Sequence, residues 1–233
     1  MQNPFERSEL ILGSEGMEKL AQSTVAVFGV GGVGSFAAEV LARTGIGEII
    51  LIDYDIIDVT NINRQIHATS KTVGMFKVEV MRDRLLDINP SLKVKVYKEK
   101  YNIETKKQLL SSEYDYVIDA IDMVSSKIDL IVECKKMGVP IISCMGAGNK
   151  LNPTMLQVGD IHSTKICPLA KIMRKELRKR NIEDLKVVWS EEVPKDINLE
   201  RDNLRKAVPG SIGFVPSVEG LIIGSEVIKD IAL

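Results

Sequence analysis

Short apolar runs alternate with longer amphipathic segments as far as residue 145. Runs rich in Val and Ile predict buried strands at residues 25–28, 48–53, 92–97, 114–121 and 139–145. Apolar positions at helical spacing predict helices at residues 8–20, 33–43, 72–89, 103–110 and 125–138. Strands that alternate with helices in this way form a parallel sheet with helices on both faces. The pattern therefore predicts an α/β fold with a Rossmann-like, doubly wound, mostly parallel sheet.

The pattern changes after residues 146–149. Short apolar runs at 155–158 and 187–189 predict two more strands, one on each side of a basic helix, and an apolar helix is predicted at 218–231. Residues 190–209 are charged and aperiodic, which favours a mobile crossover or lid. We expect this C-terminal part to extend the sheet with antiparallel pairing.

A glycine-rich segment directly follows the strand at 25–28. Gly29 permits a tight turn, Gly31 lets a phosphate approach the backbone, and Gly34 lets the next helix pack against the strand. The free N–H groups and the dipole at that helix start attract an anion. Asp53 ends the next strand, where a carboxylate can bind ribose hydroxyls. The segment predicts a nucleotide site whose backbone ligands are Gly29, Gly31, Gly32 and Gly34, but NAD, FAD and ATP sites all share this pattern.

Polar side chains that follow the strand ends distinguish among these nucleotides. They are Asp53, Asp55, Asn61, Asn63, Arg64, Gln65, Lys77 and Asp122. Attack of a carboxylate on the α-phosphate of ATP requires cations that neutralise the triphosphate, and Arg64 and Lys77 suit this role. Asp122 suits a magnesium ligand, and amides can orient ribose or phosphate oxygens. A nicotinamide dehydrogenase would leave Arg64 and Lys77 unexplained, so the set favours ATP and Mg²⁺.

Composition limits the remaining classes of protein. The 233 residues are 45% hydrophobic and carry a net charge of −1, so one domain can bury a full core without a global basic field. The cysteines, Cys134, Cys144 and Cys167, form no C-x-x-C pair, which excludes a four-thiolate zinc site and favours a reducing compartment. The chain has no apolar run of ~20 residues and no signal-peptide pattern. We expect a cytoplasmic protein that does not bind membranes.

Together these motifs resemble the ubiquitin-activating-like adenylating superfamily, which includes the ThiF-type activators of sulfur carriers. The resemblance covers residues 5–148 and rests on Gly29–Gly34, Asp53-Tyr-Asp55, Asn61-Ile-Asn63-Arg64-Gln65, Lys77 and Asp119-Ala-Ile-Asp122. It implies one adenylating domain over 1–233, with a nucleotide-binding core at 1–148 and a substrate-binding part at 149–233. In this superfamily an arginine of the partner subunit reaches the phosphates. The resemblance makes Arg7 that arginine and implies a homodimer.

Three further segments are similar to the tRNA threonylcarbamoyladenosine dehydratases of this superfamily. One lies near the start of the chain, at 7–16, and two lie later, at 146–153 and 161–170. That similarity implies ATP-dependent cyclisation of threonylcarbamoyladenosine in tRNA through an acyl-adenylate, with release of AMP and pyrophosphate. Sulfur-carrier activators usually keep two C-x-x-C pairs, which this chain lacks. Activation of a small carrier protein stays open as an alternative, as does a non-enzymatic binding subunit, although such subunits lose the polar site residues.

A basic helix is the candidate tRNA-binding element. Residues 171–180 contain six basic residues and one glutamate. The candidate contacts to the tRNA backbone are Lys171, Arg174, Lys175, Arg178 and Arg180. The alternative is a solvated helical face. Two further interpretations also stay open: an alkali-metal ion (Na⁺ or K⁺) at the turn 146–149, and a cysteine desulfurase or sulfur acceptor as partner.

Overall fold

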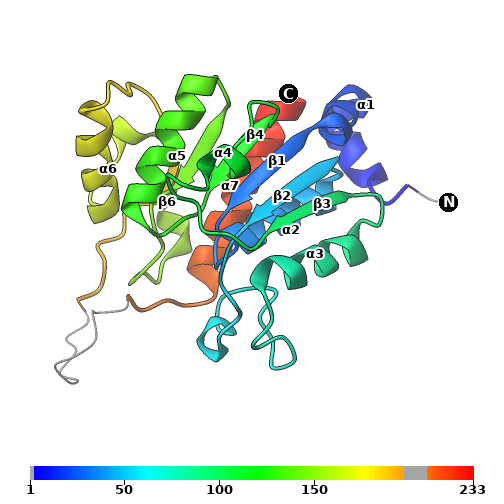
Figure 1. Ribbon diagram of the computed structural model, residues 1–233, viewed down its shortest axis with the longest axis horizontal. Coiled ribbons are helices and arrows are strands. Elements are labelled where there is room, and N and C mark those ends of the chain that lie inside the picture. The colour runs from blue at the N-terminus through cyan, green and yellow to red at the C-terminus, as the bar shows by residue number, and fades with distance from the viewer. Residues whose placement is uncertain (1–2, 197–208) are drawn as a thin grey trace.

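A computed structural model describes residues 3–196 and 209–233. Its strands form one seven-stranded sheet in the order β3-β2-β1-β4-β5-β7-β6 (Figure 1). The strands are β1 (Thr24–Phe28), β2 (Glu48–Ile52), β3 (Lys93–Tyr97), β4 (Tyr116–Asp119), β5 (Ile141–Cys144), β6 (Leu156–Asp160) and β7 (Lys186–Ser190). All neighbouring strands pair in parallel except β6 and β7, which are antiparallel. The predicted fold class, with its antiparallel extension, is confirmed.

Helices cover both faces of the sheet. They are α1 (Glu6–Gln22), α2 (Gly34–Thr44), α3 (Lys77–Ile88), α4 (Lys106–Leu109), α5 (Val124–Met137), α6 (Pro168–Arg178) and α7 (Phe214–Ala232). Alternate residues of β1 enter two cores, as strand geometry requires. Val25 and Val27 pack with residues of α1, α2, α3 and α7, while Ala26 and Phe28 pack with residues of α4, α5 and α6. The carboxyl ends of the central strands remain uncovered between these layers.

Several predicted boundaries shift for local reasons. Helix α3 starts at Lys77 rather than at 72, because Gly74 has a left-handed φ of 88° and interrupts the preceding turn. Helix α7 starts earlier than predicted, at Phe214, and has Pro216 in its first turn. Proline is tolerated there because the N–H groups of a first turn have no partner within the helix. The helix predicted at 103–110 shortens to α4. The N-terminal helix bends at Gly13, whose φ is 75°.

The predicted crossover at 190–209 is described only at its two ends. Residues 197–208 lie outside the described residues, so the lid remains a prediction. At the first end, the N–H groups of Leu151 and Asn152 donate to the Glu192 carboxylate. At the second, the N–H of Gly210 donates to Asn149 Oδ1 at 2.6 Å. Both ends are therefore attached to the segment that follows β5. Across residues 3–196 and 209–233, every helix is too short or too polar to cross a lipid bilayer.

Candidate active site

A cavity of about 500 Å³ opens at the carboxyl ends of β1, β2, β4 and β5. In a parallel α/β sheet this edge, where the strand order reverses, is where ligands bind. The cavity gathers most of the residues that the sequence predicts for the site: Gly29, Gly31, Gly32, Asp53, Asp55, Asn61, Arg64, Gln65, Lys77 and Asp122. Segments far apart in the chain thus contribute to one site, as the topology requires.

Two glycines make the phosphate loop possible. Gly29 has a φ of 89°, which L-residues with side chains rarely adopt. A Cβ on Gly34 would lie 1.9 Å from the carbonyl oxygen of Gly29, so the start of α2 could not approach β1 with any larger residue. Gly34 itself does not line the cavity; it closes the turn beneath it. The loop presents the amino end of α2 to the cavity, as an anion site needs.

Asp53 fastens the end of β2 to this loop. Its Oδ2 accepts the N–H of Val30 at 2.7 Å, and its Oδ1 accepts the N–H of Asp55 at 2.9 Å. Burial raises the pKa of Asp53 above its ordinary value, and Lys77 is the main opposing influence. A carboxylate has about four acceptor sites, so Asp53 can still accept hydroxyl groups of a ribose. Asp53 therefore retains acceptor sites for the predicted binding of a ribose.

Lys77 is a buried cation at the cavity. It is the first residue of α3, its side chain is 7% exposed, and its Nζ lies 2.6 Å from Asp55 Oδ2. The N–H of Lys77 also donates to the carbonyl oxygen of Asp55 at 3.1 Å, which fixes the start of the helix beside β2. Because the Asp55 carboxylate is 44% exposed, an incoming phosphate can compete with it for the ammonium group.

The segment 61–65 plays several different parts. Arg64 Nη1 donates to the carbonyl oxygen of Thr60 and to Asn63 Oδ1, both at 2.9 Å, which fixes the direction of the guanidinium group. Asn61 caps its own short helix by accepting the N–H of Asp58. The prediction for Asn63 needs correction: it does not line the cavity, and its amide donates to the carbonyl oxygen of Ser211 instead. The local cue was the Asn-x-Asn spacing, which cannot show which amide turns outward.

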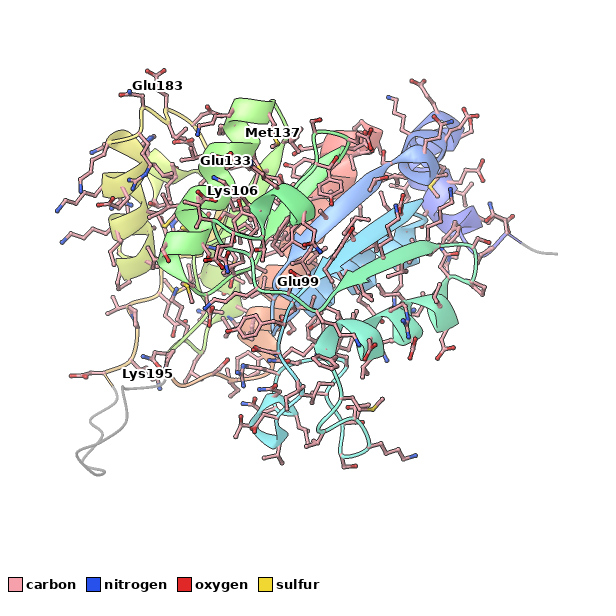
Figure 2. All side chains as sticks on the ribbon, viewed as in Figure 1. Glu99, Lys106, Glu133, Met137, Glu183 and Lys195 are labelled. Carbon is pink, nitrogen blue, oxygen red and sulfur yellow. The ribbon has the colours of Figure 1, made fainter. Side chains whose placement is uncertain are left out.

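Among the described carboxylates that line the cavity, Asp122 is the one whose oxygens accept no hydrogen bond from the protein. Asp53 and Asp55 are engaged as described above, and Glu99, labelled in Figure 2, accepts Gln108 Nε2 at 3.0 Å. Magnesium bound to a nucleotide commonly needs one or two carboxylates, with phosphate and water as the other ligands. The donor set at Asp122 fits such an ion. Over the described part of the chain, no three His, Cys, Asp or Glu side chains gather into a larger metal site.

The sequence predicts no lining residue after β3, and after β5 it predicts the turn 146–149 only as an ion site. Tyr101 packs edge-to-face on Phe28, at a centroid distance of 5.2 Å, and its hydroxyl donates to Asp129. Lys106 braces this wall by pairing with Asp129 and with Glu133, beside which it lies in Figure 2. At the other side the wall comprises Cys144, Gly146, Ala147, Gly148 and Pro216. These residues belong to no phosphate-binding pattern, so only the fold brings them to the site.

Comparison with known proteins gives the family. The pattern of the ThiF family matches residues 5–232 of the chain. The chain belongs to the ThiF family. It is 48% identical over 242 residues to the tRNA threonylcarbamoyladenosine dehydratase of Bacillus subtilis, an alignment that covers 99% of this chain and 95% of that protein.

Crystal structures of the E. coli tRNA N6-threonylcarbamoyladenosine dehydratase, in complexes with AMP and with ATP, have TM-scores of 0.89 and 0.88 to this chain at 36% identity. Each alignment covers 98% of this chain and 93% of the E. coli chain. Ubiquitin-like modifier-activating enzyme 5 of Caenorhabditis elegans is 39% identical over 120 residues, but this covers 50% of the chain and 27% of that protein. The similarity to that enzyme thus extends over half of this chain.

Arg7, predicted as a catalytic residue of this ThiF-family domain, does not line the cavity of its own chain. It is exposed on α1, near Phe5, which packs beside Gly45 just before β2 begins. The amino ends of the strands, where Phe5 lies, form the edge of the sheet opposite the cavity. Within one chain Arg7 therefore cannot act on a ligand at the glycine loop.

The basic helix α6 divides into anchored and free side chains. Arg174 Nη1 donates to the carbonyl oxygen of Thr164 at 2.8 Å and also to its hydroxyl, so it fastens α6 to the preceding turn. Arg180 pairs with Glu176 at 2.9 Å. The other predicted contacts, Lys171, Lys175 and Arg178, are exposed. A polyanion that approaches this face would meet three free cations rather than the five predicted.

Hydrogen bonds hold the turn 146–149 in place. The carbonyl oxygen of Gly146 accepts the Lys150 ammonium group at 2.9 Å. The Asn149 carbonyl oxygen accepts the N–H of Lys195, and its side-chain oxygen accepts the N–H of Gly210. The alkali-metal ion expected at this turn stays a prediction, because each carbonyl oxygen that accepts one donor keeps a second acceptor site. Cys167, at the start of α6, is buried, and its thiol donates to the carbonyl oxygen of Met145 at 3.1 Å.

Proposed function

We propose that this protein is an ATP-dependent tRNA threonylcarbamoyladenosine dehydratase. The observation that carries the proposal is the meeting, in one cavity, of a glycine loop with Lys77, Arg64 and Asp122. Similarity over almost the whole length of the B. subtilis dehydratase supports this substrate. Activation of a small carrier protein is the weaker candidate, because the ubiquitin-activating relative is similar over half of the chain.

The reaction removes one water from the threonylcarbamoyl group. An oxygen of the threonyl carboxylate attacks the α-phosphorus of ATP, and the bond to the leaving pyrophosphate breaks. A nitrogen or oxygen of the carbamoyl group then attacks the activated carbonyl, loses its proton, and expels AMP. Both reacting groups belong to one side chain, so ring closure gains from their proximity. The carboxylate oxygen departs within AMP, and the carbamoyl group loses its proton, so the side chain becomes lighter by the elements of one water.

The residues at the cavity supply electrostatic stabilisation. The ammonium group of Lys77 and the guanidinium group of Arg64 neutralise charge that develops on the phosphates. Asp53 binds the ribose, and Asp122 would hold a magnesium ion that enters with the nucleotide. When bound, Mg²⁺ would neutralise and orient the phosphate oxygens of the leaving pyrophosphate. Lys77 exchanges the Asp55 carboxylate for a phosphate oxygen when the nucleotide enters.

Arg7 acts in the partner subunit of a homodimer. Its exposure on α1 and its distance from its own cavity support this role, and the adjacent Leu10 and Ile11 are each 83% exposed. Apolar side chains so exposed are favourable in a subunit interface. Mixing Arg7→Ala with Lys77→Ala subunits should restore one intact site per dimer and recover part of the activity. No recovery, with mixed dimers verified by native mass spectrometry, would place Arg7 outside the reaction.

Lys171, Lys175 and Arg178 on α6 bind the tRNA backbone. Each is exposed, and together they form a local positive patch on a chain whose net charge is −1. Lys175→Ala should weaken tRNA binding and reduce the slope of log affinity against log salt by about 1. Lys179→Ala is the matched control, because Lys179, directly after the end of α6, is already paired with Glu176 at 2.6 Å. Equal salt slopes for both variants would remove α6 from the tRNA site.

The decisive experiment incubates tRNA that carries threonylcarbamoyladenosine with the protein, ATP and Mg²⁺. After digestion, mass spectrometry should show the nucleoside lighter by one water, with AMP formed in equal amount, and neither product with Lys77→Ala. An unchanged nucleoside, with pyrophosphate exchange only when a carrier protein ending in Gly-Gly is added, would establish the carrier-activating function instead. A sulfur-acceptor partner and a cytoplasmic location remain predictions.

A further inference from the structure

Residues 209–211 line the active-site cavity, and the proposed reaction gives them no role. Pro209, Gly210 and Ser211 all contribute to the lining, and Figure 1 draws them in orange, just before α7. They belong to no helix or strand. Backbone outside regular structure keeps its position through individual contacts, so the residues that hold this segment determine the shape of the cavity here.

Asn149 holds the segment at the wall that follows β5. Its N–H donates to the carbonyl oxygen of Gly210 at 2.8 Å, and its Oδ1 accepts the N–H of Gly210 at 2.6 Å. Pro209 packs against Gly148, which belongs to the same wall. Asn149 thus satisfies both backbone groups of a residue that is 61 positions away in the chain.

The backbone of Asn149 has an unusual conformation. Its φ is 61°, in the left-handed region that residues with side chains rarely adopt. Asparagine tolerates this region better than most residues, because its short amide can form hydrogen bonds nearby. Glycine would fit the same backbone but could not accept the N–H of Gly210. A rare conformation that brings a side chain onto a remote segment of the cavity points to a functional role.

Asn63 holds the same segment on the side of the site that follows β2. Its Nδ2 donates to the carbonyl oxygen of Ser211, and its Oδ1 accepts Arg64 Nη1, both at 2.9 Å. Gly213 approaches Asn63 so closely that a Cβ on this glycine would lie 2.7 Å from the Asn63 carbonyl oxygen. One amide therefore joins the segment to the guanidinium group that the proposed reaction places at the phosphates.

We infer that Asn63 and Asn149 are positioning residues, which hold residues 209–211 as a bridge and so keep the guanidinium group of Arg64 directed at the phosphates. The inference rests on the proposed function, in which Arg64 neutralises charge on the phosphates. A cation stabilises a transition state best when it is fixed where the charge develops, so its orientation affects kcat more than ATP affinity. Asn63 supplies one of the two acceptors of Arg64 Nη1, and the Thr60 carbonyl oxygen is the other.

Asn149→Gly tests the inference, because it removes the side-chain acceptor and leaves the left-handed backbone accessible. We expect kcat for AMP formation to fall by about 10-fold, with ATP affinity within about threefold of the wild type. Asn149→Asp keeps an acceptor for the N–H of Gly210 and should recover part of kcat. Asn152→Gly is the matched control: the Oδ1 of Asn152 accepts the N–H of Thr154 in the next turn, and kcat should stay unchanged.

A double variant tests whether the bridge acts on Arg64. Asn63→Ala should lower kcat by about 10- to 30-fold, because the guanidinium group loses one of its acceptors. If Asn149 acts through Asn63, the addition of Asn149→Gly to Asn63→Ala should lower kcat no further. Independent residues would instead multiply their losses, and that result would overturn the inference. So would a rise in KM for the tRNA alone, since the bridge would then bind tRNA without acting on Arg64.

A measurement without substrates separates this inference from the proposed function. Hydrogen exchange of the Gly210 N–H, followed by NMR, should accelerate at least about tenfold in Asn149→Gly and not in Asn152→Gly, because the bridge loses its acceptor. If exchange accelerates while the wild type leaves the tRNA nucleoside unchanged, the proposed function fails and the hold of Asn149 on the bridge stands. If the wild type dehydrates the nucleoside while exchange and kcat in Asn149→Gly are unchanged, the positioning role fails.

Discussion

Two lysine–aspartate pairs in this protein have almost the same geometry and opposite surroundings. Lys77 lies 2.6 Å from Asp55 at the cavity, where the carboxylate is 44% exposed. Lys127 lies 2.8 Å from Asp119 behind the cavity, where both side chains are fully buried. The distances alone cannot tell a ligand-binding pair from a structural one. The difference lies in whether another anion can reach the ammonium group.

Access determines what each pair contributes. A phosphate can replace Asp55, because water already reaches that carboxylate, so the bond to Lys77 can be exchanged at little net loss. Nothing can replace Asp119 without carrying a charge into the core. Lys77 is therefore suited to binding and catalysis, and Lys127 to holding the end of β4. Four substitutions would test this contrast, beginning with the largest expected effect.

Lys77→Met should abolish most of the activity and leave the fold intact. Without the ammonium group, negative charge on the phosphates is not neutralised, and we expect kcat/KM to fall by about 10³-fold. The free energy of unfolding should change by less than about 1 kcal/mol, because Asp55 is open to water. AMP release and urea unfolding measure the two effects. A large loss of stability, or near-normal AMP release, would show that the pair is structural.

Lys127→Met should reverse this outcome. It leaves Asp119 buried without a counter-ion, and breaking a buried pair from one side costs about 3–5 kcal/mol. The double variant Lys127→Met/Asp119→Asn should recover much of this stability, since the uncompensated charge is gone. Urea unfolding of the single and double variants checks both statements. If the single variant is as stable as the wild type, water must reach Asp119 and the contrast with Lys77 disappears.

The sequence predicts the functional position of Lys77 but not the buried position of Lys127, and the reason is physical. Lys77 belongs to a set of polar residues that follow strand ends beside a glycine loop, so the fold class alone places it near the phosphates. Lys127 stands in an amphipathic helix, where a lysine is ordinarily solvated. Only the structure shows that Lys127 lies on the buried side of α5, where its ammonium group faces Asp119.

The same limit applies to the C-terminal part. The pattern predicts α7 as an apolar helix, but a glutamate in such a helix does not show whether it faces water or the core. It also places Asn63 among the ligands, whereas the amide bonds to Ser211, over a hundred positions away in the sequence. In α6 it counts Arg174 and Arg180 as free cations. Contacts with other segments decide the cases of Glu219, Asn63 and Arg174, and local spacing carries no information about them. Arg180 differs, because its partner Glu176 is four positions away, a spacing that the sequence does show.

Glu219 should make stability depend on pH. Burial raises its pKa in the folded protein to about 7, from an ordinary value of 4.5, while Lys150 and Lys127 oppose the rise. The folded state therefore holds this proton to higher pH than the unfolded state. Stability is greatest below pH 4.5 as far as this group is concerned, and decreases as pH rises towards 7, by about 3 kcal/mol in total.

Comparison with Glu219→Gln isolates this contribution, because other carboxyl groups titrate in the same range. The wild type should lose stability relative to the variant as pH rises from about 4.5 to 7. Urea unfolding at several pH values gives the difference curve. A flat curve would mean that the Glu219 carboxyl group ionises as readily in the folded protein as in the unfolded chain, so that its burial does not raise its pKa.

Ser143→Ala should have the smallest effect of the four. The hydroxyl of Ser143 donates to Asp119 at 2.5 Å in a fully buried position, and a hydrogen bond to a charged group contributes about 1.5–3 kcal/mol. Asp119 keeps Lys127 and the N–H of Ile121 in this variant, so we expect a loss of about 2 kcal/mol, with kcat unchanged. A loss as large as that of Lys127→Met would show that the hydroxyl, and not the ammonium group, is the main partner of Asp119. The buried pair would then owe its stability to a neutral donor, and its contrast with Lys77 would rest on hydrogen bonding rather than on access to water.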